Sequence, residues 1–466
     1  MKQARVVAEE AAVTCFAPPE SRVDVMQPVA ASCDANRYGG KELGRMSDKT
    51  ILTLLGVLAL AFALSGSVHA VTYYVDQSRT RASDNNPGTE ALPWKTINHA
   101  ATVLRAGDTA LVKEGTYNVG ASPGWAVPAV NPSHSGTRDN PITFRAYPGH
   151  KVTITTSGGQ AAIGSAGKDY IVWDGFVVDM ADRLKGIIIC DAKECVIKHC
   201  EVIGNYIPTG DNHDGIRIER AEACRIQHNI IRGVRGDSPN SAGVKVYSKG
   251  AKNLIVEDNY IYDNTAGVFD KDFGVQNTYR RNYFTRNQTP FYGNNQGGPA
   301  VYYIYDNVFD GRIELHAANT GTEVHDNLVR ADRLVGAWAG GVVHGKIWNN
   351  IVISKSPSIM ACQIKKAPLT NALAYMDYNL YDAEPAYDFG EYTSNHQRFT
   401  LAQMRSTGFE KNSRVVSSLN DVFEDRKSCR LLAKWKTAGR YNDALGPENV
   451  AVLLDTARYG PSGSGR

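Results

Sequence analysis

The sequence predicts an all-β protein, a right-handed parallel β-helix in which short strands wind into stacked coils. From about residue 142 onward, units recur that contain a β-branched run, an Asn and a second apolar run. The spacing of these units varies from 20 residues (Asn307 to Asn327) to 30 residues (Asn229 to Asn259), which suits coils whose loops differ in length. Their apolar residues alternate with a period of two and are rich in Ile, Val, Tyr and Phe, which favours strands over helices.

The Asn of each unit is expected to serve the bend between two strands. Asn tolerates the left-handed backbone conformation that a sharp turn requires. Its amide can also bond to the same residue one coil away, at about 4.8 Å. We therefore expect one ladder along one edge, made of Asn229, Asn259, Asn282, Asn307, Asn327 and Asn350.

A targeting signal is expected ahead of the coils. Met46 begins a short polar stretch, which is followed by an apolar run and by small residues that end at Ala70, as in a secretory signal peptide. The apolar run is shorter than the about 20 residues of a spanning helix, and a short buried helix is the alternative. We expect residues 46–70 to direct a secreted or periplasmic protein, and residues 1–45 to be a disordered extension or a start-site artefact.

The mature chain divides into a solenoid and a cover. Apolar residues at helical spacing in residues 97–104 predict a short helix over the open end of the coils, which must be capped against edge pairing. We expect residues 71–380 to form the β-helix with this N-terminal cap. Residues 381–466 are expected to form an irregular C-terminal cover and tail, with short helices at residues 400–404 and 429–437.

The charge balance limits the partners. A net charge of +3 with 21% charged residues lacks the electrostatic footprint of a nucleic-acid-binding protein. We expect no nucleic-acid partner, no membrane span once the signal is removed, and a monomer. Recognition of an acidic ligand would then depend on a local cluster.

The cysteines suggest a disulfide and not a zinc site. No CxxC pair occurs among the eight cysteines, so a zinc site of the usual thiolate spacing is not expected. Cys195 and Cys224 occupy the same place in successive coils, where stacking brings their Cα atoms within reach of a disulfide. The alternative is an inward ladder of small apolar residues.

A Gly followed by an apolar residue opens four consecutive coils and sets their register. The outward positions then fall into columns. The first column contains Ile188, Arg217, Lys245 and Phe269, and the second contains Cys190, Glu219, Tyr247 and Lys271.

The richest chemical cluster is the turn at residues 210–214, which carries Asp211, His213 and Asp214 before a strand that carries Glu219. Bunched oxygen ligands suit Ca²⁺, so Asp211, Asp214 and Glu219 are candidate metal ligands. The alternative is a turn whose short polar side chains satisfy the backbone.

Lys245 is expected one coil above Arg217. Two cations at strand spacing repel, and each lowers the proton affinity of the other, which would prepare Lys245 as a general base. The alternative is a solvated face on which both cations pair with Glu219 and Asp237. Lys271 and His213 are further candidate bases, although Lys271 lies between two Asp residues that could simply neutralise it.

Residues 90–380 resemble the pectate-lyase-like right-handed β-helix superfamily. The match to its N-terminal cap is carried by Trp94-Lys95-Thr96-Ile97-Asn98-His99-Ala100-Ala101, Ala106-Gly107-Asp108 and Gly115-Thr116-Tyr117. Gly243-Val244-Lys245-Val246 is similar to the strand that holds the lysine base of the pectate lyases, and Asp214-Gly215 to their calcium-binding Asp-Gly. The resemblance implies that Lys245 is the base and that Asp211 and Asp214 bind calcium.

The sequence also departs from these relatives. The further calcium-binding Asp residues of the pectate lyases are not found, and the Asn/Glu calcium pattern of the chondroitinase B group is not reproduced. Asp211-Asn212-His213-Asp214 is similar to the Asp-Pro-His-Asp of mannuronan epimerases, with Asn in place of Pro.

Together these features predict a lyase that cleaves a uronic-acid polysaccharide by β-elimination. Calcium or Arg217 would neutralise the substrate carboxylate, Lys245 would take the C5 proton, and Arg217, Glu219 and Tyr247 would bind the sugar. A glycoside hydrolase would need a second carboxylate, about 6.5–9.5 Å from the first in an inverting enzyme. The same fold would also suit a C5-epimerase or a non-catalytic carbohydrate-binding protein.

Overall fold

The computed structural model describes residues 70–431, with gaps at residues 182–183, 209–211, 239, 273, 295–299, 317–318, 338–341, 366, 391–395, 419, 421–422 and 426–429. All of them belong to the compact unit Ser67–Arg466. The expected extension, and the expected signal peptide up to residue 69, lie outside the described residues. Of the helix expected at residues 429–437, only Arg430–Leu431 are described, and they form strand β41.

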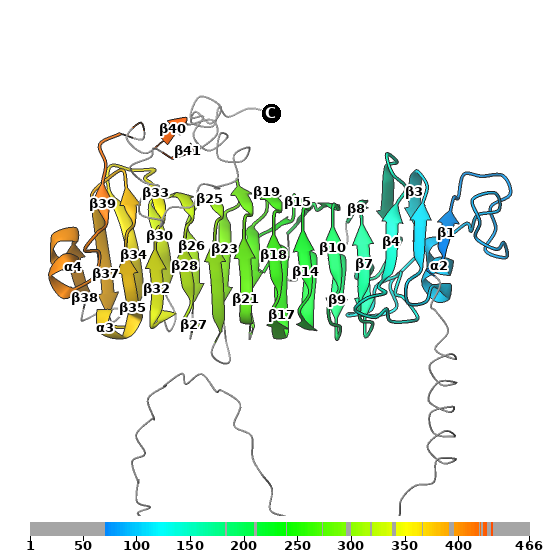
Figure 1. The fold of residues 1–466 in the computed structure, drawn as a ribbon, viewed down its shortest axis with the longest axis horizontal. Helices are drawn as coiled ribbons and strands as arrows, with labels where there is room; N and C mark the ends of the chain where they lie inside the picture. Colours follow the sequence, from blue (N-terminus) through cyan, green and yellow to red (C-terminus); the bar gives the residue numbers. More distant parts are fainter. Residues whose placement is uncertain are drawn as a thin grey trace, which may run out of the picture. The chain divides into compact units, whose positions relative to one another are not determined.

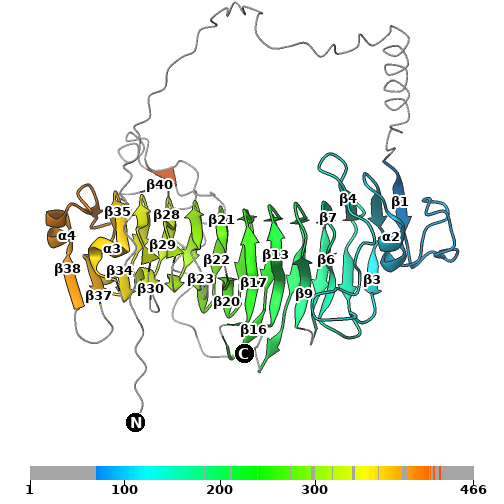
Figure 2. The same ribbon diagram turned by 90° about the horizontal axis from the view of Figure 1, so that it is seen from below.

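The described chain winds into a solenoid of parallel coils, in which a typical coil contributes three strands to three faces (Figures 1 and 2). Face 1 contains β6 (Ala161–Ala166), β9 (Lys185–Cys190), β13 (Asp214–Glu222), β17 (Ala242–Lys252), β20 (Ala266–Asp270), β23 (Thr289–Asn294), β26 (Ile313–His316), β30 (Arg333–Ala337), β34 (Ile359–Lys365) and β37 (Pro385–Gly390).

Face 2 begins with β1, at the start of the described chain, and belongs to the same hydrogen-bonded sheet as face 1. It contains β1 (Thr72–Val75), β2 (Thr109–Val112), β4 (Ile142–Ala146), β7 (Ile171–Asp174), β10 (Val196–Lys198), β14 (Arg225–Gln227), β18 (Ile255–Glu257), β21 (Val275–Arg280), β24 (Val301–Tyr305), β28 (Glu323–His325), β32 (Gly345–Trp348) and β35 (Leu373–Asp377).

Face 3 is a separate sheet. It contains β3 (Gly115–Asn118), β5 (Val152–Thr155), β8 (Phe176–Asp179), β11 (Glu201–Ile203), β15 (Ile230–Arg232), β19 (Tyr260–Tyr262), β22 (Tyr283–Thr285), β25 (Val308–Asp310), β29 (Leu328–Arg330), β33 (Ile351–Ile353), β36 (Leu380–Tyr381) and β39 (Arg414–Val415).

The remaining elements decorate or close the coils. The helices are α2 (Ile97–Val103), α3 (Leu369–Ala372) and α4 (Leu401–Thr407), and the other strands are β12 (Tyr206–Ile207), β16 (Arg235–Gly236), β27 (Asn319–Thr320), β31 (Val342–Val343), β38 (His396–Thr400), β40 (Phe423–Asp425) and β41 (Arg430–Leu431). Figure 1 shows α2 at the N-terminal end of the stack, with α3 and α4 at the C-terminal end. Among the described residues no helix is long and apolar enough to cross a bilayer.

The parallel β-helix expected from the sequence is confirmed, and so is its register. Arg217 pairs with Ile188 on one side and with Lys245 on the other, and Lys245 pairs with Phe269. The residues that alternate with them, such as Ile216 and Ile218, are fully buried in the core. The period-two pattern thus separates an apolar interior from outward columns.

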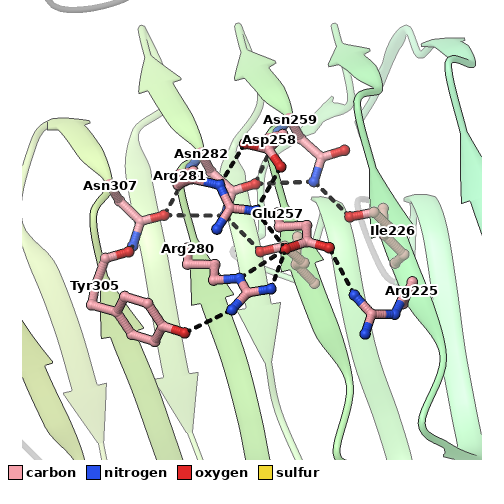
Figure 3. Close-up of polar contacts among 11 residues, drawn as sticks. Arg225, Ile226, Glu257, Asp258, Asn259, Arg280, Arg281, Asn282, Tyr305 and Asn307 are labelled. Atoms are coloured by element: carbon pink, nitrogen blue, oxygen red, sulfur yellow. Dashed lines mark hydrogen bonds and ion pairs between the residues drawn. The ribbon is translucent and has the colours of Figure 1, made fainter. Parts of the chain in front are cut away.

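The Asn ladder is confirmed and is longer than expected. In each step an Asn Oδ1 accepts from the backbone N–H and the side-chain amide of the ladder residue one coil earlier, as between Asn259 and Asn282 (Figure 3). The amide also donates to a backbone carbonyl, as Asn259 does to Ile226. The ladder begins at the backbone N–H of Cys200 and continues past Asn350 to Asn379.

The expected backbone role of these Asn residues is wrong. The left-handed residue is the one before the ladder Asn, for example His228 (φ 55°), Asp258 (φ 57°) or Asp306 (φ 57°), and none of the ladder Asn residues has a positive φ. The bend is therefore made by a neighbour of varied type. The Asn is needed for its amide, which satisfies buried backbone groups of adjacent coils.

The C-terminal end of the solenoid differs from the expectation in its details. Parallel stacking continues through Pro385–Gly390, which pairs with β34, beyond the boundary expected at residue 380. The expected helix near residues 400–404 is present as α4. The ladder ends where Ser413 Oγ accepts from the backbone N–H of Asn379 and Glu410 accepts from its amide, so the last buried groups are paired.

The two stacked cysteines are neighbours, as expected. Cys195 and Cys224 directly precede the paired residues Val196 and Arg225, and both are buried free thiols. A hydrogen bond between their side chains lowers the pKa of Cys195 and raises that of Cys224. The structure contains no bond between them, which agrees with the alternative of an inward ladder of small apolar residues.

Replacing a central ladder residue should destabilise the solenoid. Asn282→Ala leaves the backbone N–H and side-chain amide of Asn259 without their acceptor, so we expect a loss of roughly 3 kcal/mol, since each buried unsatisfied group costs about 1–3 kcal/mol. The midpoint of chemical denaturation measures this. Asn118→Ala, at an exposed position, is the control, and equal midpoints for the two variants would contradict a stabilising role of the ladder.

Candidate functional site

Face 1 carries a row of buried cations on three successive coils. Lys185 on β9, Arg217 on β13 and Lys245 on β17 are each fully buried although they point away from the apolar core. Lys185 pairs in register with Asp214, and Arg217 pairs with Lys245. We call these three residues the cation row. Parallel stacking makes Arg217 and Lys245 neighbours, because they occupy equivalent positions of successive coils, whereas Lys185 stacks on Asp214, the carboxylate that binds Arg217.

Two carboxylates hold the central guanidinium. Arg217 Nη1 donates to Asp214 Oδ2 at 2.6 Å, and Arg217 Nε donates to Glu219 Oε1. Burial lowers the pKa of Arg217, but Asp214 and Glu219 outweigh it and the net pKa is raised. Arg217 Nη2 has no hydrogen-bond partner among the described residues although it is buried. The guanidinium therefore keeps one donor that a ligand can use.

Lys245 is a buried amine with a reduced proton affinity. Its Nζ donates to the Asn240 carbonyl at 2.9 Å and to Asn212 Oδ1 at 3.1 Å, and it lies 3.6 Å from Asp214 Oδ1. Burial lowers the pKa of Lys245 to about 8; Asp214 opposes this shift, while Arg217 and Lys271 add to it. The lowered pKa of Lys245 agrees with the expectation, although burial is a larger cause than the repulsion between cations, whereas the pKa of Arg217, which was expected to fall as well, is raised.

Lys185 is a second such amine, and the alignment of columns did not single it out. Its Nζ donates to Gln160 Oε1 at 2.8 Å. Burial lowers the pKa of Lys185 to about 8, and Arg217 adds to this effect. The sequence did contain a signal for Lys185, because this residue directly precedes Gly186 just as Asp214 directly precedes Gly215. The aligned columns began after these glycines and therefore left it out.

Aromatic rings flank the cations. Tyr247 is partly exposed, and its ring centroid lies 4.5 Å from Arg217 Cζ and 5.5 Å from Lys245 Nζ. On the other side the Trp125 ring centroid lies 3.5 Å from Lys185 Nζ and 5.3 Å from Arg217 Cζ. Trp125 comes from a loop, so no register argument could have found it. These contacts are cation–π interactions, which offset part of the cost of burying charge.

Lys271 and His213 stand at the margin of the cation row. Lys271 Nζ donates to Asn240 Oδ1 at 3.2 Å and lies 5.0 Å from the Tyr247 centroid. His213 Nδ1 contacts the Arg235 carbonyl at 3.1 Å, and burial lowers the pKa of His213. Its Nε2 is buried with no hydrogen-bond partner among the described residues.

The structure does not show the solvated face on which Arg217 and Lys245 would pair with Glu219 and Asp237. The cation row is buried, and Asp237 accepts from the Tyr206 hydroxyl at 2.5 Å. Arg217 does pair with Glu219, as that alternative expected, but it also pairs with Asp214, and Lys245 lies near Asp214 and not near Asp237. Four cations (the cation row and Lys271) face two carboxylates (Asp214 and Glu219), so the cluster has an excess of positive charge and suits an anionic ligand.

The described carboxylates do not fit a calcium ion. Asp214 is engaged by Arg217 and Lys245, and Glu219 by Arg217 and Arg220. A cation placed there would face the cation row, whereas Ca²⁺ prefers six to eight oxygen ligands. No group of three or more metal-binding side chains occurs among the described residues. Asp211 lies outside the described residues, so the calcium site expected from the sequence is not tested by the structure, and the described carboxylates alone do not support it.

Calorimetric titration can test the calcium prediction without an activity assay. An ion that binds only the folded protein raises its Tm. Because Arg217 neutralises Asp214 and Glu219, we expect Ca²⁺ to give no binding heat beyond dilution and no such increase in Tm. An increase in Tm that Asp214→Asn abolishes would contradict this expectation and support a ligand set that includes Asp214.

A second charged cluster on face 2 is a structural network. Glu257 accepts from Arg225, Arg280 and Arg281, and Arg280 also donates to the Tyr305 hydroxyl (Figure 3). These arginines lower the pKa of Glu257 against the opposing effect of burial. Its groups satisfy one another, so the cation row is the better candidate site.

Two family descriptions match the chain. One is "Pel9A-like, right handed beta helix region", which matches residues 73–266, and the other is "Right handed beta helix region", which matches residues 185–354. A relative from Bacillus subtilis (strain 168), the uncharacterized protein YwoF, is 27% identical over 189 residues. That match covers 40% of this chain and 35% of YwoF, so it spans about a third of the relative's length.

Solved structures with a similar fold include a pectate lyase, Pel9A, with a TM-score of 0.46 and 16% identity over 61% of this chain and 76% of that chain. An alginate lyase from Paenibacillus sp. str. FPU-7 has a TM-score of 0.42 and 17% identity, over 56% and 92% of the two chains. A lacto-N-biosidase from Eubacterium ramulus has a TM-score of 0.35 and 13% identity, over 66% and 71%. The family descriptions confirm the pectate-lyase-like right-handed β-helix at the level of the fold.

Proposed function

We propose that this right-handed parallel β-helix is a lyase that cleaves a uronic-acid polysaccharide by β-elimination at the cation row. The observation that carries the proposal is a lysine with a pKa of about 8 in register with a buried arginine that keeps a free donor. An amine of this kind can take a proton near neutral pH, and the guanidinium can hold a carboxylate beside it.

The reaction needs two things from the protein. Removal of the C5 proton, next to the sugar carboxylate, places negative charge on that carboxylate, and Arg217 stabilises this charge through its unpaired Nη2 donor. Lys245 accepts the proton. The electron pair forms the C4–C5 double bond, the C4–O4 bond breaks, and the departing oxygen takes a proton from solvent or a neighbouring acid.

Burial of the site affects how both Lys245 and Arg217 would act on the substrate. The Lys245 ammonium is held by Asn212 and Asn240, which lie just before β13 and β17. Substrate must replace these contacts, and its carboxylate then enters a region with little water, where electrostatic interactions are stronger. Tyr247 and Lys271 border this region on its partly exposed side and would contact the sugar. No step of the proposal requires calcium.

A C5-epimerase is the second candidate. The observation that favours it is the pair of lysines, Lys185 and Lys245, each with a pKa of about 8, on either side of Arg217. An epimerase removes the C5 proton from one face and returns a proton to the other, which requires two groups. A hydrolase is less well supported, because Asp214 and Glu219 are both bound to Arg217.

Pectate, alginate and glycosaminoglycan substrates together provide the test of reaction type. A lyase forms unsaturated products that absorb in the ultraviolet. An epimerase incorporates deuterium at C5 in D₂O without unsaturation, and a hydrolase forms new reducing ends without absorbance. A non-catalytic protein binds without turnover. We expect unsaturated products, and their absence on every substrate bound would contradict the proposal.

Substitution of Lys245 should remove the base. We expect Lys245→Met, which keeps the side-chain volume, to lower kcat by about 10²–10⁴-fold with a small change in KM, as for loss of a general base. Arg217→Gln should lower kcat and raise KM, because it touches the carboxylate before and during the reaction. Lys346→Ala, an exposed lysine paired with Glu323 on face 2, is the control.

If Lys245→Met keeps full activity while the protein remains folded, Lys245 is not the base. Lys271 and His213 would then be the next residues to substitute, because both adjoin the cation row.

The pH dependence of kcat/KM should follow the neutral form of Lys245. A base acts only when it is unprotonated, so kcat/KM should rise with pH and level off above a midpoint near the lysine pKa of about 8 in the free protein. At pH 7 about a tenth of the lysine would be neutral. Stopped assays from pH 6 to 10 at substrate concentrations well below KM measure this. A rate that falls across pH 7–9 would contradict a lysine base.

A further inference from the structure

The segment between β3 and β4 crosses face 1 ahead of the cation row. Its later part forms the first stretch of that face: Ala129 N donates to the Ala161 carbonyl, and Val130 forms a parallel bridge with Ile163. Asn98 of α2 donates its amide to the carbonyls of Val119 and Ala129. The segment is therefore hydrogen-bonded at both ends, and residues 122–127 form the loop between these two attachment points.

This loop covers the outward surface of the coils that precede Arg217. Ala126 packs against Ala161, Ile188 and Cys190, three residues that point outward from the core and are nevertheless at most 1% exposed. Trp125, beside it, is 46% exposed while its ring lies over Lys185. Its ring therefore leaves an aromatic surface open to solvent directly beside Lys185, where it can contact a ligand.

The two directions along face 1 therefore differ. Toward the N-terminal end, the outward column is covered at Ile188 and Cys190. Toward the C-terminal end, the column passes through the buried Phe269 and reaches the partly exposed Tyr292, and Tyr247 beside Lys245 is also partly exposed. Figure 2 shows β9, β13, β17, β20 and β23 side by side in this order. The loop thus lies over face 1 at β9, whereas Tyr247 and Tyr292 offer partly exposed aromatic rings in the other direction.

We propose that this loop closes the substrate site at Lys185, so that the site receives the end of a uronic-acid chain and the protein cleaves near that end. The inference rests on the proposed function. Trp125 stacks against the apolar face of the terminal sugar, and Lys185 pairs with an anionic group of the same sugar. Substrate then extends from Arg217 and Lys245 toward Tyr292.

Product size and viscosity measured together test the proposal on the wild-type protein. An enzyme that cleaves near chain ends releases short unsaturated products from the first minutes, while the viscosity of the polymer falls slowly. We expect this pattern. A rapid fall in viscosity with long early products would overturn the closed-end inference and leave the lyase proposal intact.

Removing the Trp125 side chain from the loop should change the sizes of the early products. We expect Trp125→Ala to raise KM for short oligomers about tenfold, as for loss of one strong aromatic contact, and to shift early products to longer chains. Trp125→Phe should restore most of the wild-type pattern. Tyr375→Ala, which removes an exposed aromatic residue of face 2, is the control. Unchanged products and KM in Trp125→Ala would overturn the role of Trp125.

Binding stoichiometry separates this inference from the proposed reaction. With Lys245→Met, which keeps the site but lacks the base, a site for chain ends binds one protein per oligouronate whatever the oligomer length. An open site binds more proteins as the oligomers become longer. One protein per chain without turnover by the wild type would overturn the reaction alone, and a stoichiometry that rises with length would overturn the closed end alone.

Discussion

The arrangement of the strand side chains on face 1 depends on the register between coils, and the buried Asn ladder fixes that register. Each ladder amide donates to a carbonyl, and each Oδ1 after that of Asn229 accepts from two donors of the adjacent coil. A slip of one residue would leave all of these groups unpaired inside the protein, at a cost of about 1–3 kcal/mol each, and would turn outward side chains into the core. The ladder therefore determines which residues become neighbours on face 1.

The fixed register stacks Arg217 on Lys245 and Lys185 on Asp214, and this has a consequence for chemistry. Burying a charge costs several kcal/mol unless it is paired. Asp214 and Glu219 compensate Arg217, but Lys185 and Lys245 share what remains and their pKa values fall to about 8. The cluster around Glu257 also has more arginines than carboxylates, but its three arginines are all bound to Glu257. At the cation row, Arg217 Nη2 has no hydrogen-bond partner among the described residues and two lysines have a lowered pKa, which makes this row the better candidate for a ligand site.

The sequence was sufficient to predict the features that follow from its repeats. The Asn spacing and the Gly-apolar pairs predicted the coils, the ladder and the column that joins Arg217 to Lys245, because stacking converts sequence period directly into contact. It was not sufficient for what loops contribute. Trp125 reaches Lys185 from a segment outside the repeat, and the burial of Lys245, which dominates its pKa, depends on Asn212 and Asn240 in loops of irregular length.

The same limit explains the error about the ladder Asn. Composition connects Asn with left-handed turns, but at this bend His228 and Asp258 adopt that conformation and the following Asn does not. Only the hydrogen bonds distinguish the two roles, and they lie between residues more than twenty positions apart in sequence.

The position of the site near the N-terminal end of the solenoid follows from how that end is covered. An open coil must hide its edge, and here the chain does so with α2 and with the segment that α2 holds through Asn98. Each coil advances only about 4.8 Å, so a loop fixed at Ala129 can extend over the first few strands of face 1 and no further. Lys185 and Arg217 lie within that reach, and Tyr292 lies several coils beyond it. A cap that protects the edge thus also supplies one wall of the site, which explains why Trp125 belongs to the cap and not to the repeat.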